Sequence, residues 1–216
     1  MYWKPIAAAL LPGLLLSGCA GGAARAGTGT AAERVTSWRK VATEADRKRL
    51  RDWHRAWDSA LPRARTADGG AIAADPALFA PDEARSGPAL PPGGYRCRVF
   101  KLGAAGTAMR EFTAYPAFRC KISDEGGMAS FQKLTGSQRP TGLLFPDDGT
   151  RMVFVGTLML GDETAPLRYG ADPQRDMIGY VDRIGERRWR LVLPWPSFES
   201  QLDVIELVPE EAGAAP

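Results

Sequence analysis

Histidine and cysteine are scarce in this chain, and their scarcity excludes most common catalytic and metal sites. The 216 residues include one His and three Cys. A Ser-His-Asp hydrolase needs a His beside its nucleophile, but His54 falls in a predicted helix, and neither Ser137 nor Ser200 lies in a Gly-x-Ser-x-Gly elbow. A zinc site needs His and Cys ligands that the chain lacks. We therefore predict neither a metal nor a cofactor.

A clustered excess of one charge is missing as well. The chain carries 28 basic and 25 acidic residues, for a formal net charge of +3. Proteins that bind nucleic acid usually concentrate Lys and Arg on one surface, whereas here Arg alternates with Asp and Glu along the chain. We therefore expect no nucleic-acid partner.

A long hydrophobic run is the third absence, and it bears on residues 1–18, which have the form of a secretory signal peptide. Their apolar core, residues 6–16, is shorter than the roughly 20 residues that span a bilayer. It ends in Leu16-Ser17-Gly18-Cys19, which resembles the lipobox of bacterial lipoproteins. We predict that lipid on Cys19 anchors the protein in the membrane, while an ordinary signal peptide with an incidental Cys is the alternative. Because Ala20 rather than Asp follows, we expect the periplasmic face of the outer membrane.

The next part of the chain divides into a tether and a helical region. Residues 19–35 are small and low in complexity, which predicts a flexible tether. Residues 36–93 predict one amphipathic helix and a connection rich in Pro, Ala and Gly, with a short helix within 76–84. Thr43 opens the main helix with a capping pattern, and Pro62 ends or kinks it. The apolar face, which contains Trp53 and Trp57, is expected to pack on the protein's own sheet, with a partner or membrane surface as the alternative.

Residues 94–209 have the alternation and turn residues of antiparallel strands. Eight strands are predicted, at residues 94–102, 111–122, 128–134, 139–145, 150–160, 175–184, 187–193 and 201–208. This spacing predicts a mainly β domain, either an antiparallel eight-stranded barrel or a sandwich, with the N-terminal amphipathic helix against it. The likeness to lipocalin-type (calycin) barrels is architectural only, because the first strand has no Gly-x-Trp motif. Residues 210–216 are expected to form a disordered tail.

Two cysteines remain once Cys19 is assigned to lipid. Cys97 and Cys120 fall on the inner faces of the first two strands, and a hairpin around residues 103–110 places them opposite each other. Disulfides form in exported proteins, and this pair lacks the Cys-x-x-Cys spacing of a thiol redox site. We predict a structural disulfide between Cys97 and Cys120.

The sixth and seventh strands join at Gly185-Glu186, which fits a two-residue type II′ turn. This register puts Asp182 beside Trp189 on the core face, where a carboxylate needs a partner, and Arg187 is the nearest candidate. The same face would carry Ile178, Tyr180, Leu191 and Leu193.

Charged residues also gather in the loops between the later strands. A network of Arg–carboxylate bonds that closes these loops is the simplest interpretation. A ligand pocket lined by the same residues is the second, and an acid–base pair of carboxylates is the third. A calcium site is not expected, because the acids do not form an EF-hand loop. The candidate residues are Arg139, Asp162, Glu163, Arg168, Tyr169, Asp172, Arg175, Asp176, Asp182, Trp189 and Glu199.

Several short blocks of sequence are distinctive as a set. Among them are Tyr95-Arg96-Cys97-Arg98, Gly136-Ser137-Gln138-Arg139, Tyr169-Gly170-Ala171-Asp172 and Arg188-Trp189-Arg190-Leu191. Together they resemble a family of exported bacterial proteins known only as a domain of unknown function (DUF4893). The resemblance covers roughly residues 36–209, supports the strand order, and implies no activity.

We therefore predict a lipid-anchored envelope protein that is not an enzyme and binds a small or lipidic ligand, or an envelope protein partner. One alternative is a hydrolase of the envelope that works through carboxylates. The other is a scaffold lipoprotein that acts through its Trp-bearing helix.

Overall fold

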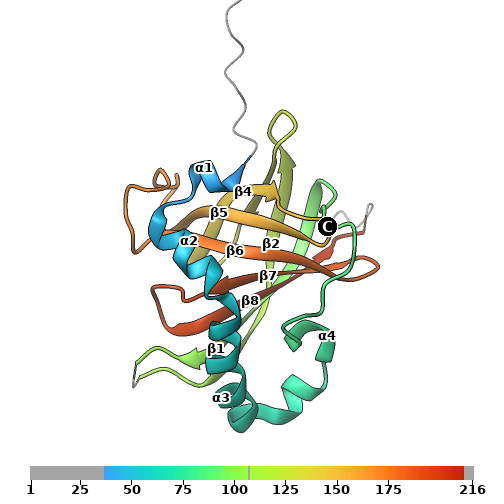
Figure 1. The fold of residues 1–216 in the computed structure, drawn as a ribbon, viewed down its shortest axis with the longest axis vertical. Helices are drawn as coiled ribbons and strands as arrows, with labels where there is room; N and C mark the ends of the chain where they lie inside the picture. The colour runs from blue at the N-terminus through green and yellow to red at the C-terminus, as the bar shows by residue number, and fades with distance from the viewer. Residues whose placement is uncertain (1–36, 107, 212–216) are drawn as a thin grey trace, which may run out of the picture. The chain divides into compact units, whose positions relative to one another are not determined.

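The computed structural model describes residues 37–106 and 108–211. The predicted signal peptide, the lipidation site Cys19 and the predicted tether lie outside these residues. Eight antiparallel strands form a closed barrel in which each strand pairs with its neighbour in sequence and β8 pairs with β1 (Figure 1). The strands are β1 (Gly93–Ala104), β2 (Phe112–Asp124), β3 (Ala129–Lys133), β4 (Gln138–Pro146), β5 (Arg151–Leu160), β6 (Asp176–Gly185), β7 (Arg188–Pro194) and β8 (Ser200–Pro209). The predicted fold is confirmed, and the structure is a barrel rather than a sandwich.

The barrel interior is filled by side chains from every strand. Buried members of this core include Tyr95, Cys97, Phe131, Phe154 and Leu191. Phe154 reaches the barrel wall where Gly142 pairs with Gly156, and a Cβ added to either glycine would meet its ring within 3 Å. Among the described residues, these side chains fill the middle of the barrel, and the hollows described below lie at its ends and on its outer surface.

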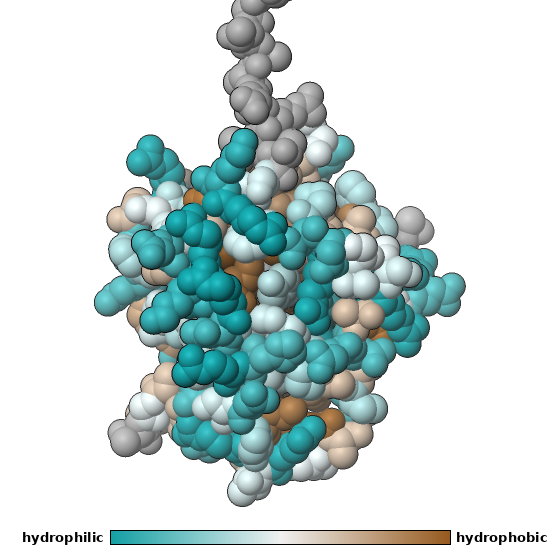
Figure 2. All heavy atoms as spheres, in the orientation of Figure 1, coloured by the Kyte–Doolittle hydropathy of each residue, from teal (hydrophilic) through white to brown (hydrophobic). Residues whose placement is uncertain are grey.

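In the described residues four helices cover parts of the outer surface, where one amphipathic helix and a short helix within 76–84 were predicted. They are α1 (Trp38–Val41), α2 (Glu44–Arg51), α3 (Trp53–Ala73) and α4 (Pro76–Phe79). The predicted helix is broken at Asp52, and α3 then continues through Pro62 until its backbone leaves helical geometry at Asp68. Trp53 and Trp57 are buried and pack with residues of the barrel's outer face. On the side that carries α2 and α3, hydrophilic side chains predominate (Figure 2).

The disulfide between Cys97 and Cys120 is confirmed. The two residues are diagonal neighbours, because Cys97 lies opposite Phe118 and Tyr95 lies opposite Cys120. The bridge spans 23 residues of sequence, with 6.0 Å between the two Cα atoms. It joins β1 to β2 inside the barrel.

The predicted register of the β6–β7 hairpin is wrong by one residue. Asp182 pairs with Arg190, and Val181 pairs with Leu191, because the ladder shifts between Arg183 and Gly185. A slip of one residue moves side chains to the opposite face of a sheet. Asp182 therefore lies outside the barrel wall, away from Trp189, which is part of the interior core.

Among the described residues, no helix is both long enough and apolar enough to cross a membrane.

Candidate functional site

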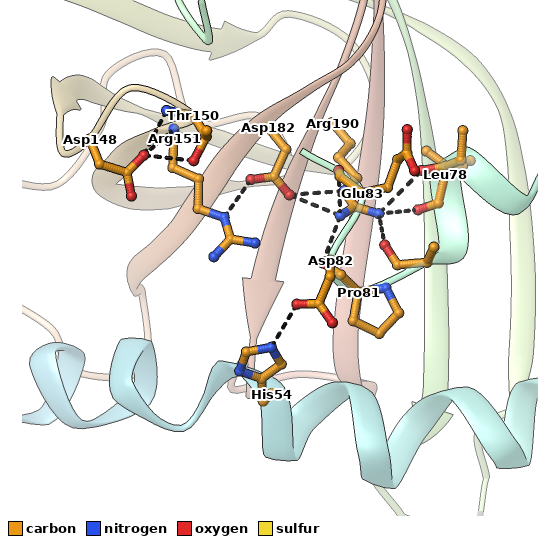
Figure 3. Close-up of polar contacts among 12 residues, drawn as sticks. His54, Leu78, Pro81, Asp82, Glu83, Asp148, Thr150, Arg151, Asp182 and Arg190 are labelled. Carbon is orange, nitrogen blue, oxygen red and sulfur yellow. Dashed lines mark hydrogen bonds and ion pairs between the residues drawn. The ribbon is translucent and has the colours of Figure 1, made fainter. Parts of the chain in front are cut away.

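Asp182 is the centre of a buried ionic cluster between the barrel and the segment that follows α3 (Figure 3). Its two carboxylate oxygens accept hydrogen bonds from different arginines. Arg151 Nε donates to Oδ1 at 3.0 Å, and Arg190 donates to Oδ2 from Nε and Nη2 at 3.0 and 2.9 Å. Asp182 is 1% exposed and Arg190 is fully buried. Both charges are therefore compensated inside the protein.

Arg190 also holds α4 and the chain that follows it. Its two terminal nitrogens donate to the backbone carbonyls of Ala77, Leu78, Ala80, Pro81 and Glu83 at 2.6 to 3.3 Å. Burial lowers the pKa of Arg190, although the neighbouring Asp182 opposes this effect. All three guanidinium nitrogens of Arg190 are thus bonded within the protein, as expected for a structural cluster.

His54 lies near this cluster but outside it. Its Nε2 is 3.0 Å from Asp82 Oδ1, and both side chains are largely exposed (Figure 3). No Ser or Cys of the described residues is bonded to His54, so the imidazole has no nucleophile to activate.

The predicted loop network exists around Glu163. Arg175 donates to both of its carboxylate oxygens at 2.9 and 3.0 Å, and Arg139 donates to its backbone carbonyl at 2.6 Å. The bonds from Arg175 lower the pKa of Glu163 to about 2. Glu163 therefore stays ionised near neutral pH and cannot serve as the proton donor of a carboxylate hydrolase.

Several other candidate residues from the sequence do not hydrogen-bond to Glu163. Asp162 and Arg168 are exposed, and the Asp172 carboxylate accepts only from the backbone of Gln174 among the described residues. Trp189 packs inside the barrel against Tyr95, with ring centroids 6.4 Å apart. These residues do not converge with the Glu163 network into one site.

Tyr169 stabilises the start of α2, and Asp176 fixes the backbone next to Tyr169. The Thr43 side chain accepts from the Asp46 backbone, as the capping pattern predicts. The Tyr169 hydroxyl accepts from the Thr43 backbone at 3.0 Å and donates to the Asp46 carboxylate. The carboxylate of Asp176 accepts from the Gly170 backbone at 2.8 Å, and burial raises its pKa. The Tyr169 hydroxyl thus links the N-cap residue Thr43 to Asp46 in the first turn of α2, from 123 residues further along the chain than Asp46.

Tyr169→Phe is expected to lower the free energy of unfolding by about 1–2 kcal/mol, because it leaves the Thr43 amide without its acceptor. Urea unfolding measures this change. Tyr115→Phe is the control, since the described residues supply no hydrogen-bond partner for that hydroxyl. Equal stability of both variants would contradict the capping role.

A second polar group lies inside one end of the barrel, which we call the barrel mouth. Lys101 on β1 faces Asp203 on β8, and its Nζ lies 3.0 Å from Asp203 and 3.3 Å from Glu199. Ser200 donates to the other oxygen of Asp203. Burial alone would lower the pKa of Lys101, but the two carboxylates outweigh burial and raise it. This lysine is thus neutralised by its neighbours.

Lys133 on β3 extends into the same barrel mouth, but its surroundings differ from those of Lys101. It is 3% exposed, and its Nζ donates to the backbone carbonyls of Thr135 and Gln138 at 2.7 and 2.9 Å. The ammonium also lies 3.6 Å from the centre of the Phe118 ring. No carboxylate of the described residues lies within ion-pair distance. Burial, together with the charges of Arg139 and Lys101, lowers the pKa of Lys133 from 10.5 to about 8.

Two adjoining hollows lie beside these lysines. Their volumes are about 30 and 90 Å³, and both are lined by Val99, Lys101, Lys133 and Gln138. The rest of the wall is mixed: Leu158, Phe198 and Ile205 are apolar, whereas Asp176, Asp203 and Glu199 bring carboxylates to it. Between β7 and β8, Trp195 and Glu199 have positive φ angles of 50° and 69°, which non-glycine residues adopt at a cost. A hollow beside a buried cation, with a strained rim, characterises a small binding site.

The other barrel end carries a larger hollow, of about 660 Å³, near Trp189 and Arg187. Its charged lining residues are exposed or half-buried, so it lacks a desolvated charge that could recognise a ligand. We therefore place the candidate site at the barrel mouth.

The sequence interpretation identified only Glu199 and Asp176 among the residues that line or border the mouth. Lys101 and Lys133 were missed, although a signal was present. Lys101 continues the inward alternation of Tyr95, Cys97 and Val99, and Lys133 follows Phe131 by two residues. A lysine at an inward position of a predicted barrel strand is therefore a usable marker.

Fold and site together define an up-and-down β-barrel with a buried polar mouth. The chain belongs to the family described as Domain of unknown function (DUF4893), whose model matches residues 38–207. No curated protein and no solved structure matches the chain. Among the described residues, no group of three or more His, Cys, Asp or Glu could hold a metal ion.

Proposed function

We propose that this protein is a non-enzymatic binding protein of the cell envelope whose barrel mouth takes a small anionic ligand. The observation that carries the proposal is Lys133, a buried ammonium that borders a cavity and has no carboxylate partner among the described residues. A buried charge is costly unless it is paired, so an anion that enters the cavity gains a partner that the protein does not supply.

The size of the cavity limits the ligand. Hollows of about 30 and 90 Å³ accommodate a carboxylate or phosphate group with a short apolar part, but not an acyl chain. This favours the small ligand over the lipidic one. Of the two alternatives, the carboxylate hydrolase is disfavoured by the commitment of Glu163 to Arg175, and the scaffold by the burial of Trp53 and Trp57.

The anchor is the second part of the proposal. Lipid on Cys19 would hold the domain at the periplasmic face of the outer membrane, and the support for it is the lipobox-like sequence. Mass spectrometry of the protein purified from membranes tests this directly. A mature N-terminus at Cys19 with acyl chains is the expected result, and an unmodified Cys19 would contradict the anchor.

Binding of acetate and inorganic phosphate should depend on Lys133. We expect Lys133→Met to weaken both by about tenfold to a hundredfold, because a hydrogen bond to a charged group contributes about 1.5–3 kcal/mol. The exposed Lys121→Met on the outer face of β2 is the matched control and should bind as the parent does. Titration followed by amide NMR gives the affinities. Equal binding by all three proteins, or tight binding of palmitate, would contradict the proposed site.

Stability should depend on pH through the same lysine. The pKa of Lys133 is about 8 in the folded protein and near 10.5 in the unfolded chain. Between these values the unfolded chain binds more protons, so the free energy of unfolding rises with pH. Relative to Lys133→Met, the parent should gain about 2 kcal/mol between about pH 8 and pH 10. Urea unfolding at both pH values checks this. If the parent and Lys133→Met differ in free energy of unfolding by the same amount at both pH values, the pKa of Lys133 is not lowered by folding.

A further inference from the structure

An uncovered apolar groove lies on the outside of the barrel. Leu143 and Leu167 are the exposed large hydrophobic residues among those described, at 37% and 40%. They line a single hollow of about 200 Å³ with Val41, Pro166 and Tyr169. We call this feature the β4–β5 groove. Single exposed leucines are ordinary, but two that share one groove mark a contact surface.

The helices leave this groove open. α3 packs chiefly on β1 and β8, and α2 packs on β6. α1 packs on β5 (Figure 1). Its last residue, Val41, lines the groove. Through Val41 the groove therefore lies close in sequence to Ser37, where the described residues begin.

Chain length brings this surface close to the proposed lipid. Ser37 is the first described residue and follows Cys19 by 18 residues. Whatever its conformation, such a segment spans no more than about 65 Å, because an extended chain advances at most about 3.6 Å per residue. A lipid anchor at this range would keep the domain at a high effective concentration near the membrane. A weak contact between the groove and the membrane would then be enough to orient the domain.

Two exposed cations are next to lining residues of the groove in the sequence. Lys40 precedes Val41, Arg168 follows Leu167, and both are exposed. Each Lys or Arg near an anionic membrane contributes about 1 kcal/mol of attraction. Apolar side chains flanked by cations match an anionic lipid surface better than a hydrophobic protein partner.

We propose that the β4–β5 groove is the membrane-facing surface of the domain, with Leu143 and Leu167 at the level of the lipid headgroups and Lys40 and Arg168 against anionic lipid. This inference rests on the proposed anchor at Cys19. It does not depend on the anion site at the barrel mouth.

Methyl NMR of the acylated full chain tests the proposal in nanodiscs that contain phosphatidylglycerol and a headgroup spin-labelled lipid. The methyl signals of Leu143 and Leu167 should broaden, while that of Ala67, exposed on α3, should not. A Lys40→Glu/Arg168→Glu variant should lose this selective broadening, whereas Arg65→Glu on α3 should keep it.

The outcomes separate the two proposals. If Cys19 carries lipid but the methyl signals of Leu143, Leu167 and Ala67 broaden equally, or those of Ala67 broaden most, the orientation is wrong and the anchor stands. An unmodified Cys19, measured by mass spectrometry on the same sample, overturns both the anchor and the membrane-facing surface.

Discussion

Arg190→Met is expected to lower the free energy of unfolding by about 3–5 kcal/mol, the largest effect of any single substitution proposed for this protein. The substitution removes the guanidinium but leaves Asp182 almost fully buried, with Arg151 as its remaining partner. It also removes the donor from five backbone carbonyls of α4 and the segment that follows it. Loss of one partner of a buried pair is costly because the other charge stays desolvated.

Urea unfolding measures the effect of Arg190→Met, and Arg187→Met is the control. Arg187 is exposed in the adjoining turn, so its loss should change stability by less than about 0.5 kcal/mol. Hydrogen exchange should also show faster opening around residues 77–83 in the Arg190 variant. A loss below about 1 kcal/mol, with unchanged exchange, would mean that the cluster does not hold this segment.

Removal of the disulfide gives the second large effect. Cys97→Ala/Cys120→Ala should lower the free energy of unfolding by about 3 kcal/mol, because the bridge closes a loop across 23 residues and constrains the unfolded chain. The substituted side chains also leave space in the barrel core. Reduction of the parent protein should reproduce most of the loss without the change in volume.

The comparison of reduced parent and double variant separates loop closure from packing. Thermal unfolding of the parent with and without reductant measures the contribution of loop closure. The melting temperature of the double variant should not depend on reductant. Unchanged melting of the parent on reduction would contradict a stabilising bridge.

Local alternation was sufficient to predict the barrel strands. Residues 111–122 alternate clearly, and the predicted strand differs from β2 by two residues at most at either end. What alternation cannot supply is an extra residue inside a hairpin. The shift between Arg183 and Gly185 moves Asp182 from Trp189 to Arg190, which explains a carboxylate that the sequence alone left without a convincing partner.

The helix beyond Pro62 shows a different limit. Proline in a helix interior removes one hydrogen bond and strains the preceding turn. Leu61 and Ala64 are nevertheless buried in the cluster between α3 and the barrel. Tertiary packing therefore outweighs the local preference to stop, and a local pattern does not reveal this balance.

The mouth could not be assembled from sequence because barrel closure brings it together. Lys101, Lys133 and Asp203 come from β1, β3 and β8, and β1 meets β8 only when the barrel closes. The charged loops attracted attention instead, because their residues cluster in sequence. Of these, the Glu163–Arg175 pair is satisfied internally and Glu199 joins the mouth.

The most direct test of the anion site is the pKa of the Lys133 side chain, measured by NMR of its Cε and Nζ with and without inorganic phosphate. Without phosphate we expect a pKa of about 8. Bound phosphate should raise this pKa by about one unit or more, because a nearby negative charge favours the ammonium, while the pKa of Lys121 should not change. A Lys133 pKa near 10.5 in both conditions, or a value that phosphate leaves unchanged, would contradict an anion site at the barrel mouth.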